Sequence, residues 1–409
     1  MPQRCHDKTV FNDLRQMSIN RRQFLAAGAG LSFLGLAARS ALAAAPAQKL
    51  LVLVYLKGGN DAYNTFVPIA DAKYYKLRPT LAITSDQTIT INDQLGLNAA
   101  LQPLMPAWAS RDLAIVQGIG QQEITNQHYR DLEMQFTAAG PEQYYTEGWV
   151  TRALLKNPLR GSTRISTLDA LAFGDLDIRV SDPMGPFRGE LLRAVQVQQM
   201  ADWFATSHLS LTPHLATMPA KTSAANFLRP ESTVLKAVFP QDEFSQALRA
   251  TVELAAAGLA PPVVHITINA DDADQHHAFD THWQQRDYHG AALSRLAGGL
   301  SAFRAGMLEI GAWDHTLRAT SDEFGRSPKE NENHGTQHGW SSTHLVAGGR
   351  VKGGLYGKAP PAMDVYALDG PPPVIDYREL YTTVIESWWG GRADGVFDRR
   401  FKPLDLLRS

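Results

Sequence analysis

The chain has 409 residues, with 39 Lys/Arg, 41 Asp/Glu and a formal net charge of −2 at pH 7. This balance contains no basic excess that would favour nucleic acid or an anionic membrane surface as a partner. The single cysteine, Cys5, lies close to the start of the chain. A chain with one cysteine forms no internal disulfide and no multi-thiolate metal site. The length is sufficient for one large α/β domain with insertions or for two smaller domains.

The first 45 residues have the pattern of a twin-arginine signal peptide. Arg21 and Arg22 precede an Ala, Gly and Leu-rich run, and residues 41–43 (Ala-Leu-Ala) form a small-x-small cleavage site. A membrane anchor is the alternative, but Arg39 and the many Gly and Ala make the run too short and too weakly apolar to span a bilayer stably. We therefore predict export by the twin-arginine machinery, removal of the leader with no stable membrane anchor afterwards, and a periplasmic or secreted product.

Continuous apolar runs predict the strands of a buried sheet. Residues 50–56 (L-L-V-L-V-Y-L) lack alternation, as expected for a central parallel strand that is buried on both faces. Shorter runs at 113–119, 263–268, 316–320 and 343–347 are also strand-like. We therefore predict an α/β fold with a mostly parallel central sheet flanked by helices, in a single domain over residues 46–409.

Helical periodicity occurs between these strands. The predicted helices are 98–108, 126–139, 190–204, 241–259, 288–308 and 377–389. Short strands are also possible within 163–173 and at 178–180, whereas 208–230 is rich in Pro, Ser, Thr and Ala and is typical of a loop. We expect 141–260 to be an insertion that shapes or covers a pocket.

Acidic and imidazole side chains follow the predicted strand ends. They are Asp61, Asp280, His282, Glu323 and His338. In open α/β sheets ligands bind at the strand ends, because the loops there form a crevice. Carboxylate oxygen and imidazole nitrogen are common ligands of catalytic zinc or manganese. The alternative is a polar surface with capping acids, and for Asp61 alone an N-cap role is the expectation.

Three motifs together resemble a known family. They are G-G-N-D-A-Y-N-T-F-V-P at 58–68, F-D-T-H at 279–282, and S-D-E-F-G-R followed by G-T-Q-H-G and G-G-R-V-K-G-G-L-Y-G within 321–357. Their order, their spacing and the leader resemble the twin-arginine-exported family 1501 of the domains of unknown function, over essentially all of the chain after the leader. That family is similar to the alkaline phosphatase and sulfatase superfamily. The resemblance implies an alkaline-phosphatase-like fold, two metal ions at the strand ends and hydrolysis of phosphate or sulfate esters, although a fold alone does not determine a function.

The resemblance also implies roles for single residues. The metal ligands would be Asp61, Asp280, His282, Glu323 and His338. The metal would be a divalent ion, with zinc, manganese and calcium as the candidates. Two metal ions would activate a water or hydroxyl and neutralise an oxygen of the ester. His128, at the start of a helix, is a catalytic candidate. From the residues themselves, Thr65 is a candidate nucleophile, with metal-bound water as the alternative. Arg326 is a candidate ligand for the substrate oxyanion, with a structural salt bridge behind the loop as the alternative.

The sequence departs from the family pattern at three places. Gln127 precedes His128 where relatives have Ser, so the expected serine nucleophile is missing. Asp322 separates Ser321 from Glu323, which leaves the register of the acid open by one residue. Gln337 stands where relatives often have Asp. Three functions therefore stay open: an ester hydrolase, a non-catalytic binding or assembly protein, and an envelope transferase of phospho groups.

Overall fold

The computed structural model describes residues 48–159, 234–269, 279–362 and 371–408, together with 168–174, 185–189, 192, 194–197, 200, 208–209 and 227–228. The predicted leader, the possible strand at 178–180 and most of the predicted loop at 208–230 lie outside these residues. Residues 47–409 form one compact unit. None of the helices in the described ranges is long and apolar enough to cross a membrane.

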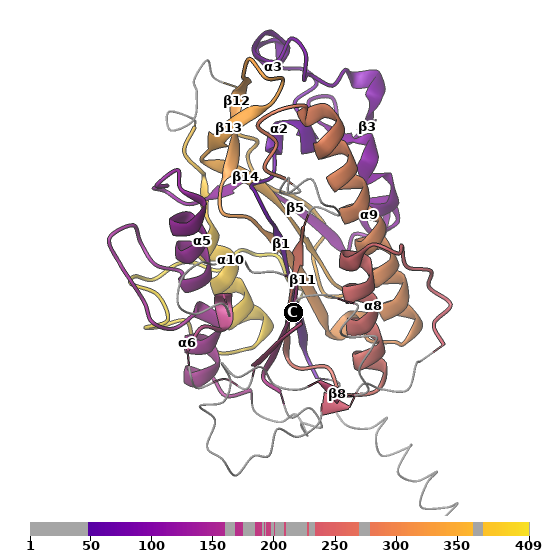
Figure 1. Ribbon diagram of the computed structural model, residues 1–409, viewed down its shortest axis with the longest axis vertical. Helices are drawn as coiled ribbons and strands as arrows, with labels where there is room; N and C mark the ends of the chain where they lie inside the picture. Colours follow the sequence, from indigo (N-terminus) through magenta and orange to yellow (C-terminus); the bar gives the residue numbers. More distant parts are fainter. Residues whose placement is uncertain are drawn as a thin grey trace, which may run out of the picture. The chain divides into compact units, whose positions relative to one another are not determined.

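A nine-stranded sheet forms the centre of this unit (Figure 1). The strand order is β15-β5-β14-β11-β1-β10-β6-β7, and β16 also pairs with β5. The strands are β1 (Leu50–Leu56), β5 (Leu113–Gly120), β6 (Ala170–Phe173), β7 (Ala194–Val197), β10 (Val263–Ile268), β11 (Thr316–Ser321), β14 (Ser341–Ala347), β15 (Gly354–Gly357) and β16 (Ile375–Asp376). Within this sheet only β14 runs against the others, which confirms the mostly parallel α/β fold.

Helices cover both faces of the sheet (Figure 1). Alternate side chains of β1 enter opposite cores, because successive residues of a strand point to opposite faces. One core contains helices α8 (Glu243–Ala256) and α9 (Gln285–Glu309). The other contains α5 (His128–Thr137), α6 (Trp149–Lys156) and α10 (Tyr377–Thr382). The continuous apolar sequence of β1 is thus explained by burial on both sides.

Several predicted elements differ from those observed. The predicted helix at 98–108 is a 3-10 helix, η2 (Ala99–Leu104), followed by the short helix α4 (Met105–Ala109); Pro103 and Pro106 lack the N–H that a regular helix requires. Within the predicted helix at 190–204, residues 194–197 (A-V-Q-V) form β7, where valines suit a pleated strand. Helix α10 continues into a π-helical segment, η7 (Thr383–Trp388).

The described parts of residues 141–260 contribute to the layers themselves. Strands β6 and β7 extend the sheet beyond β10, α6 lies on one face and α8 on the other. The sequence between these parts makes the segment look separate, because its Pro, Ser and Thr-rich stretch interrupts the apolar pattern. A covering role for the remainder of 141–260 stays a prediction.

The candidate site lies where three neighbouring strands end. Strands β11, β1 and β10 are adjacent and parallel, so their carboxyl ends meet at one edge of the sheet. The turn after β1 contains Gly58 and Gly59, with φ of +107° and +87°. A Cβ atom on Gly58 would lie 2.3 Å from the backbone nitrogen of Asp280, so only glycine allows this close approach.

A hairpin replaces the loop predicted after β11. Strands β12 (Gly325–Glu330) and β13 (Thr336–Gly339) pair in antiparallel fashion and place His338 opposite Arg326.

Between β1 and β5 lie the short helices α2 (Ala62–Thr65) and α3 (Ala72–Leu77), the 3-10 helix η1 (Ser85–Gln87), and a small sheet of β2 (Phe66–Val67), β3 (Thr88–Thr90) and β4 (Gly96–Asn98). A 3-10 turn, η5 (Trp313–His315), links α9 to β11. Further short elements are η3 (Gly185–Phe187), β8 (His208–Leu209) and β9 (Phe227–Leu228).

Candidate metal centre

Four side chains of the metal-ligand type converge at the strand ends. They are His128, Asp280, His282 and His338, each of which offers one ligand atom within 4.8 Å of the others. Asp280 and His282 follow β10, His338 lies on β13, and His128 is the first residue of α5. The structure therefore brings together three of the five predicted metal ligands and one predicted catalytic residue.

Three of these residues form a tighter group. The Nε2 atom of His282 lies 3.0 Å from Asp280 Oδ1 and 3.0 Å from His338 Nε2, while His338 Nε2 lies 3.7 Å from the same Oδ1. Two neutral imidazoles that face each other share at most one proton between their Nε2 atoms. At least one of the two Nε2 atoms therefore carries no proton, and its lone pair is available to a cation that binds beside the carboxylate.

His128 stands beside this group and is held from behind by Glu323. The Nδ1 atom of His128 lies 2.8 Å from Glu323 Oε1, and its Nε2 atom lies 3.5 Å from the other oxygen of Asp280, Oδ2. Burial lowers the pKa of His128, but its hydrogen bonds to Asp280 and Glu323 prevail and raise that pKa to about 9. An ionised carboxylate only accepts, so Nδ1 carries a proton and Nε2 faces the cluster.

Glu323 is a supporting residue for this cluster. Its carboxylate accepts hydrogen bonds from the Tyr55 hydroxyl at 2.8 Å and from the Gly58 backbone N–H at 3.1 Å, in addition to His128. Outer carboxylates of this kind orient histidines next to metal ions. The sequence predicts Glu323 as a direct metal ligand. In the structure Glu323 instead contacts His128, so it supports the cluster from outside.

Arg326 supports Asp280 and the turn after β1. Its guanidinium donates to Asp280 Oδ1 and to the carbonyl of Gly58, and its Nε donates to the Gly59 carbonyl at 3.0 Å. Burial opposes ionisation of Asp280, but three histidine hydrogen bonds and the charge of Arg326 hold the pKa of Asp280 far below its usual range. The predicted role of Arg326 as an oxyanion ligand is therefore not supported, because its donors are directed at protein acceptors; the salt-bridge alternative matches the structure.

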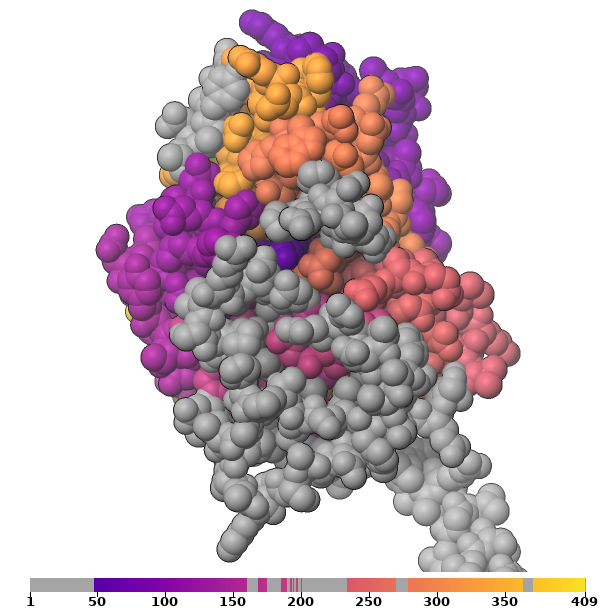
Figure 2. Space-filling view, in the orientation of Figure 1, coloured from indigo at the N-terminus to yellow at the C-terminus, as the bar shows by residue number. Residues whose placement is uncertain are grey.

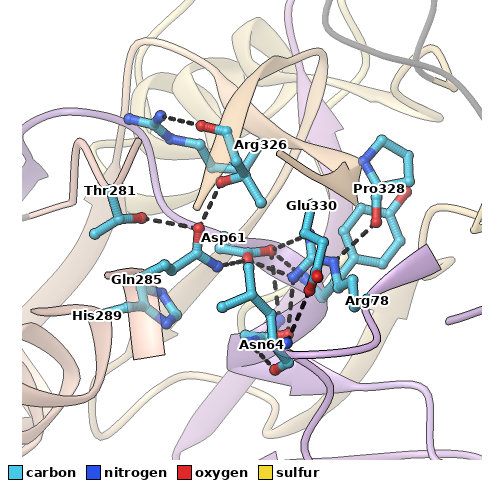
Figure 3. Close-up of polar contacts among 12 residues, drawn as sticks. Asp61, Asn64, Arg78, Thr281, Gln285, His289, Arg326, Pro328 and Glu330 are labelled. Carbon is cyan, nitrogen blue, oxygen red and sulfur yellow. Dashed lines mark hydrogen bonds and ion pairs between the residues drawn. The ribbon is translucent and has the colours of Figure 1, made fainter. Parts of the chain in front are cut away.

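Asp61 belongs to a second network, which reaches Arg326 through Gln285 and Thr336 (Figure 3). Its carboxylate caps α2 by accepting from the backbone N–H of Tyr63 at 3.0 Å, and it forms a fully buried ion pair with Arg78 at 2.5 Å. Gln285 donates to the same carboxylate. The prediction that Asp61 is a metal ligand is not supported, since Arg78, Gln285 and the helix N-terminus occupy both oxygens. The alternative N-cap role is confirmed.

The hydroxyl of Thr65 contacts Asn60 and His289, which are not members of the cluster. Its hydroxyl donates to Asn60 Oδ1 at 2.8 Å, and His289 Nε2 lies 3.0 Å from that oxygen and 3.4 Å from the Thr65 hydroxyl. Because the amide oxygen of Asn60 is an acceptor, His289 Nε2 donates to it and has no lone pair for Thr65. The geometry therefore does not support Thr65 as the nucleophile.

Gln127 and Gln337, where the sequence departs from the pattern of the resembled family, are the sequence neighbours of His128 and His338. Gln127 precedes α5, and its backbone N–H donates to Asp131 Oδ2 at 3.2 Å. Gln337 lies on β13 beside His338, and its backbone N–H donates to the Ser327 hydroxyl at 3.1 Å. Neither contact supplies a nucleophile or a carboxylate to the cluster.

The sequence leaves open whether Asp322 or Glu323 is the acid of the motif, and the contacts of the two side chains answer this question. Glu323 faces His128, whereas Asp322 accepts from the Ser342 hydroxyl at 2.5 Å and from the Asn60 backbone N–H at 3.2 Å. Burial raises the pKa of Asp322 well above its usual value, and the charge of Glu323 adds to this effect. Glu323 is thus the acid that serves the cluster.

Sequence reasoning missed three residues around the site. Phe324 stacks on His338 with ring centroids 4.1 Å apart and lies 4.8 Å from the His128 ring. Its position inside the E-F-G-R motif was a signal that could have indicated it. Arg78 and Tyr55 have no such signal, since one lies outside every motif and the other reads as an ordinary strand residue.

Solvent reaches the cluster from one side. The His128 side chain is 31% exposed and the His282 side chain is 24% exposed, whereas Glu323 behind them is buried. Figure 2 shows indigo atoms from the N-terminal end of the described chain at the bottom of a hollow between the α5 and α9 segments. The centre therefore has a buried supporting side and an accessible imidazole side.

These features define an α/β protein with a candidate metal centre at the ends of parallel strands. Residues 187–386 match the family described as "Protein of unknown function (DUF1501)". Among the curated proteins no match was found.

Several solved structures have distant similarity to most of this chain. The lipoteichoic acid synthase LtaP from Listeria monocytogenes is 10% identical, with a TM-score of 0.42 over 87% of this chain and 74% of that chain. A protein in the alkaline phosphatase superfamily from Vibrio parahaemolyticus is 9% identical, with a TM-score of 0.41 over 85% and 67%. The PsFucS1 sulfatase from Pseudoalteromonas sp. is 8% identical, with a TM-score of 0.39 over 90% and 72%.

Proposed function

We propose that this chain is an exported, metal-dependent hydrolase of phosphate or sulfate esters. The observation that carries the proposal is the convergence of Asp280 Oδ1, His282 Nε2 and His338 Nε2 within 3.7 Å of one another. Three protein ligands of this type, with room for a fourth group, are typical of catalytic zinc centres. The motifs that carry the family resemblance contain the same three residues.

The donor set narrows the choice of metal. One carboxylate and two imidazoles suit zinc or manganese. Calcium takes six to eight oxygen ligands, so these imidazoles make calcium the weakest of the three predicted ions. A bound divalent ion would polarise an ester oxygen and lower the pKa of water at the site. Because Asp61 and Glu323 have other partners, we propose a single-ion centre in place of the two-ion centre that the resemblance implies.

The surrounding residues have tasks of their own. Arg326 keeps Asp280 ionised and fixes its orientation. Glu323 accepts a hydrogen bond from the Nδ1–H group of His128. This bond orients the imidazole so that Nε2 faces the ester. From Nε2, His128 would bind an ester oxygen and donate a proton to the leaving oxygen. Water is the attacking group in this proposal, since the Thr65 hydroxyl is bonded to Asn60.

The test combines metal content with turnover. Protein exported by its native host would be analysed for metals by mass spectrometry and assayed with a panel of phosphate and sulfate monoesters and diesters. We expect about one zinc or manganese per chain, loss of metal and turnover in Asp280→Asn and His338→Ala, and no loss in His315→Ala, a histidine outside the cluster. Wild-type protein with no metal and no turnover would overturn the proposal.

A non-catalytic ligand-binding or assembly role is the second candidate. Gln127 and Gln337 favour it, because both stand where relatives carry a potential nucleophile or ligand. A protein that retains the metal but cleaves no ester of the panel would support this role over hydrolysis.

Export is tested separately by changing Arg21 and Arg22 to Lys, which should leave the precursor in the cytoplasm. Normal periplasmic levels of that variant would contradict export by the twin-arginine route.

A further inference from the structure

A second pocket lies away from the candidate metal centre, between the sheet and α9. It has a volume of about 210 Å³. Its buried wall includes Leu104, Leu300, Trp313 and Arg318, whereas the exposed residues Pro106 and Ala305 lie at its opening. Helix α9 begins at Gln285, three residues after His282, and the rise of a helix puts roughly 28 Å between Gln285 and Arg304 at the pocket. The pocket is therefore separate from the strand-end centre.

The guanidinium of Arg318 is the unusual feature of this pocket. Arg318 is 2% exposed, and its Nε atom is buried without a hydrogen-bond partner among the described residues. It lies in the middle of β11, where a side chain cannot move to the surface without disturbing the sheet. Burial lowers the pKa of Arg318 to about 9, so the group still carries its charge at pH 7. A buried charge without a partner is costly.

The nearby acid is already engaged. Asp112 accepts from Arg304 Nε at 3.0 Å and Nη2 at 2.8 Å, and from Trp313 Nε1 at 2.9 Å. The charge of Asp112 also acts on Arg318, but the hydrogen bonds of this carboxylate go to Arg304 and Trp313. The pocket region keeps one positive charge that Asp112 does not neutralise.

We propose that this pocket binds a small monocarboxylate with an apolar body, with Arg318 as its counter-ion. A carboxylate matches the planar guanidinium and the single excess charge, whereas a phosphate dianion would leave a negative charge against apolar walls. Leucine, proline and tryptophan side chains provide the apolar contact for the remainder of the ligand. The volume lies below the roughly 300–1,000 Å³ of pockets for drug-sized molecules, so the ligand is small.

Benzoate is the probe, and benzamide is its neutral control of nearly the same shape. We expect benzoate to raise the thermal unfolding midpoint of the full chain in a saturable manner, because a ligand that binds only the folded state stabilises it. Benzamide and inorganic phosphate should need at least about tenfold higher concentrations, since each loses the charge match or the apolar contact. Acetate and butanoate would define how much of the apolar wall is used.

Two variants locate the binding. Arg318→Met should reduce the benzoate effect at least about tenfold, and Ala305→Trp should do the same by filling the opening of the pocket. Arg318→Met should also be no less stable than the wild type, because it removes a buried guanidinium whose Nε has no hydrogen-bond partner among the described residues. Arg378→Met is the matched control: Arg378 is buried but paired with Asp376 at 2.8 Å, so this variant should lose stability and keep the benzoate response.

Either of two results would overturn the proposal. The first is the absence of a saturable response of the wild type to any of the three monocarboxylates, or a benzamide response equal to that of benzoate. The second is an unchanged benzoate response in both Arg318→Met and Ala305→Trp. The comparison of benzoate with benzamide uses only the wild type, so the test does not depend on the folding of a variant.

Discussion

Two clusters, one around Asp61 and one around Asp280, lie near the ends of the neighbouring strands β1 and β10. They differ in the partners of their carboxylates. In the Asp61 cluster the carboxylate is fully buried and is neutralised by Arg78, with Gln285 and the α2 N-terminus as further donors (Figure 3). In the Asp280 cluster Oδ1 is paired with Arg326, but the carboxylate also meets three imidazoles and is 14% exposed.

The difference follows from the chemistry of the partners. A guanidinium, an amide and the N-terminus of α2 donate to both oxygens of Asp61, so this carboxylate has no oxygen left for a metal ion. An imidazole loses its proton readily and then offers a lone pair, so an acid with several imidazoles can exchange protons for a divalent ion. The first cluster is therefore structural, and the second is the one that we propose for metal binding.

The largest expected effect is on stability, in the Asp61 cluster. Arg78→Met leaves the Asp61 carboxylate buried without its partner, which should lower the free energy of unfolding by about 3–5 kcal/mol. Urea denaturation measures this loss. Arg392→Met, which removes an exposed ion pair with Asp394, should have no measurable effect. A fully stable Arg78→Met protein would contradict the structural role of the cluster.

The next effect concerns metal binding in the Asp280 cluster. His282→Ala removes the imidazole closest to Asp280 Oδ1, so metal affinity should fall by more than about 100-fold. Loss of a residue that only supports a ligand costs at most about 100-fold, so a larger loss identifies a direct ligand. Isothermal titration with zinc or manganese checks this value. The stability of metal-free protein should change little, since His282 is partly exposed. Unchanged affinity would exclude His282 as a ligand.

Glu323→Gln tests the support behind the Asp280 cluster. The amide keeps the shape of the side chain but weakens the hold on the Nδ1 proton of His128, so turnover should fall by about 10- to 100-fold. Bound metal, measured by mass spectrometry, should stay near the wild-type level. A proportional loss of metal would instead make Glu323 a direct ligand.

Asp322→Asn tests the neighbour that faces away from the cluster. The folded-state pKa of Asp322 is raised, mainly by burial, so the folded protein binds a proton that the unfolded chain releases above about pH 4. The free energy of unfolding should therefore fall as pH rises above this value. In Asp322→Asn the free energy of unfolding should decrease less steeply with pH, by at most about 1.4 kcal/mol per pH unit.

The measurement is urea denaturation between pH 4 and 8, as a proposed range, with exposed Asp86→Asn as the control. The control should follow the wild-type pH dependence. Equal slopes in Asp322→Asn and the wild type would show that the Asp322 carboxyl is not protonated in the folded state.

The smallest expected effect is that of Thr65→Val. The variant loses the hydrogen bond to Asn60, which should lower stability by about 0.5–1.5 kcal/mol, and it should keep turnover and bound metal. Thermal unfolding and the ester assay measure the two properties. A collapse of turnover with the metal retained would restore Thr65 as the nucleophile.

The sequence by itself determined the α/β class, the main strands of the sheet and three residues of the strand-end cluster. Its apolar runs located β1, β5, β10, β11 and β14, because buried strands require continuous apolar side chains. Its motifs indicated Asp280, His282 and His338 together, because loops after parallel strands meet at one edge of the sheet. It did not distinguish Asp61 from Asp280, since both are acids after a buried strand.

Only the tertiary structure decided what each acid contacts. Arg78 and Tyr55 lie outside the predicted site residues, yet one neutralises Asp61 and the other orients Glu323. The role of a carboxylate depends on which charges and donors surround it, and those partners come from segments far apart in the chain. Local pattern therefore predicted where polar groups gather, whereas long-range packing determined which of them stay available to a cation.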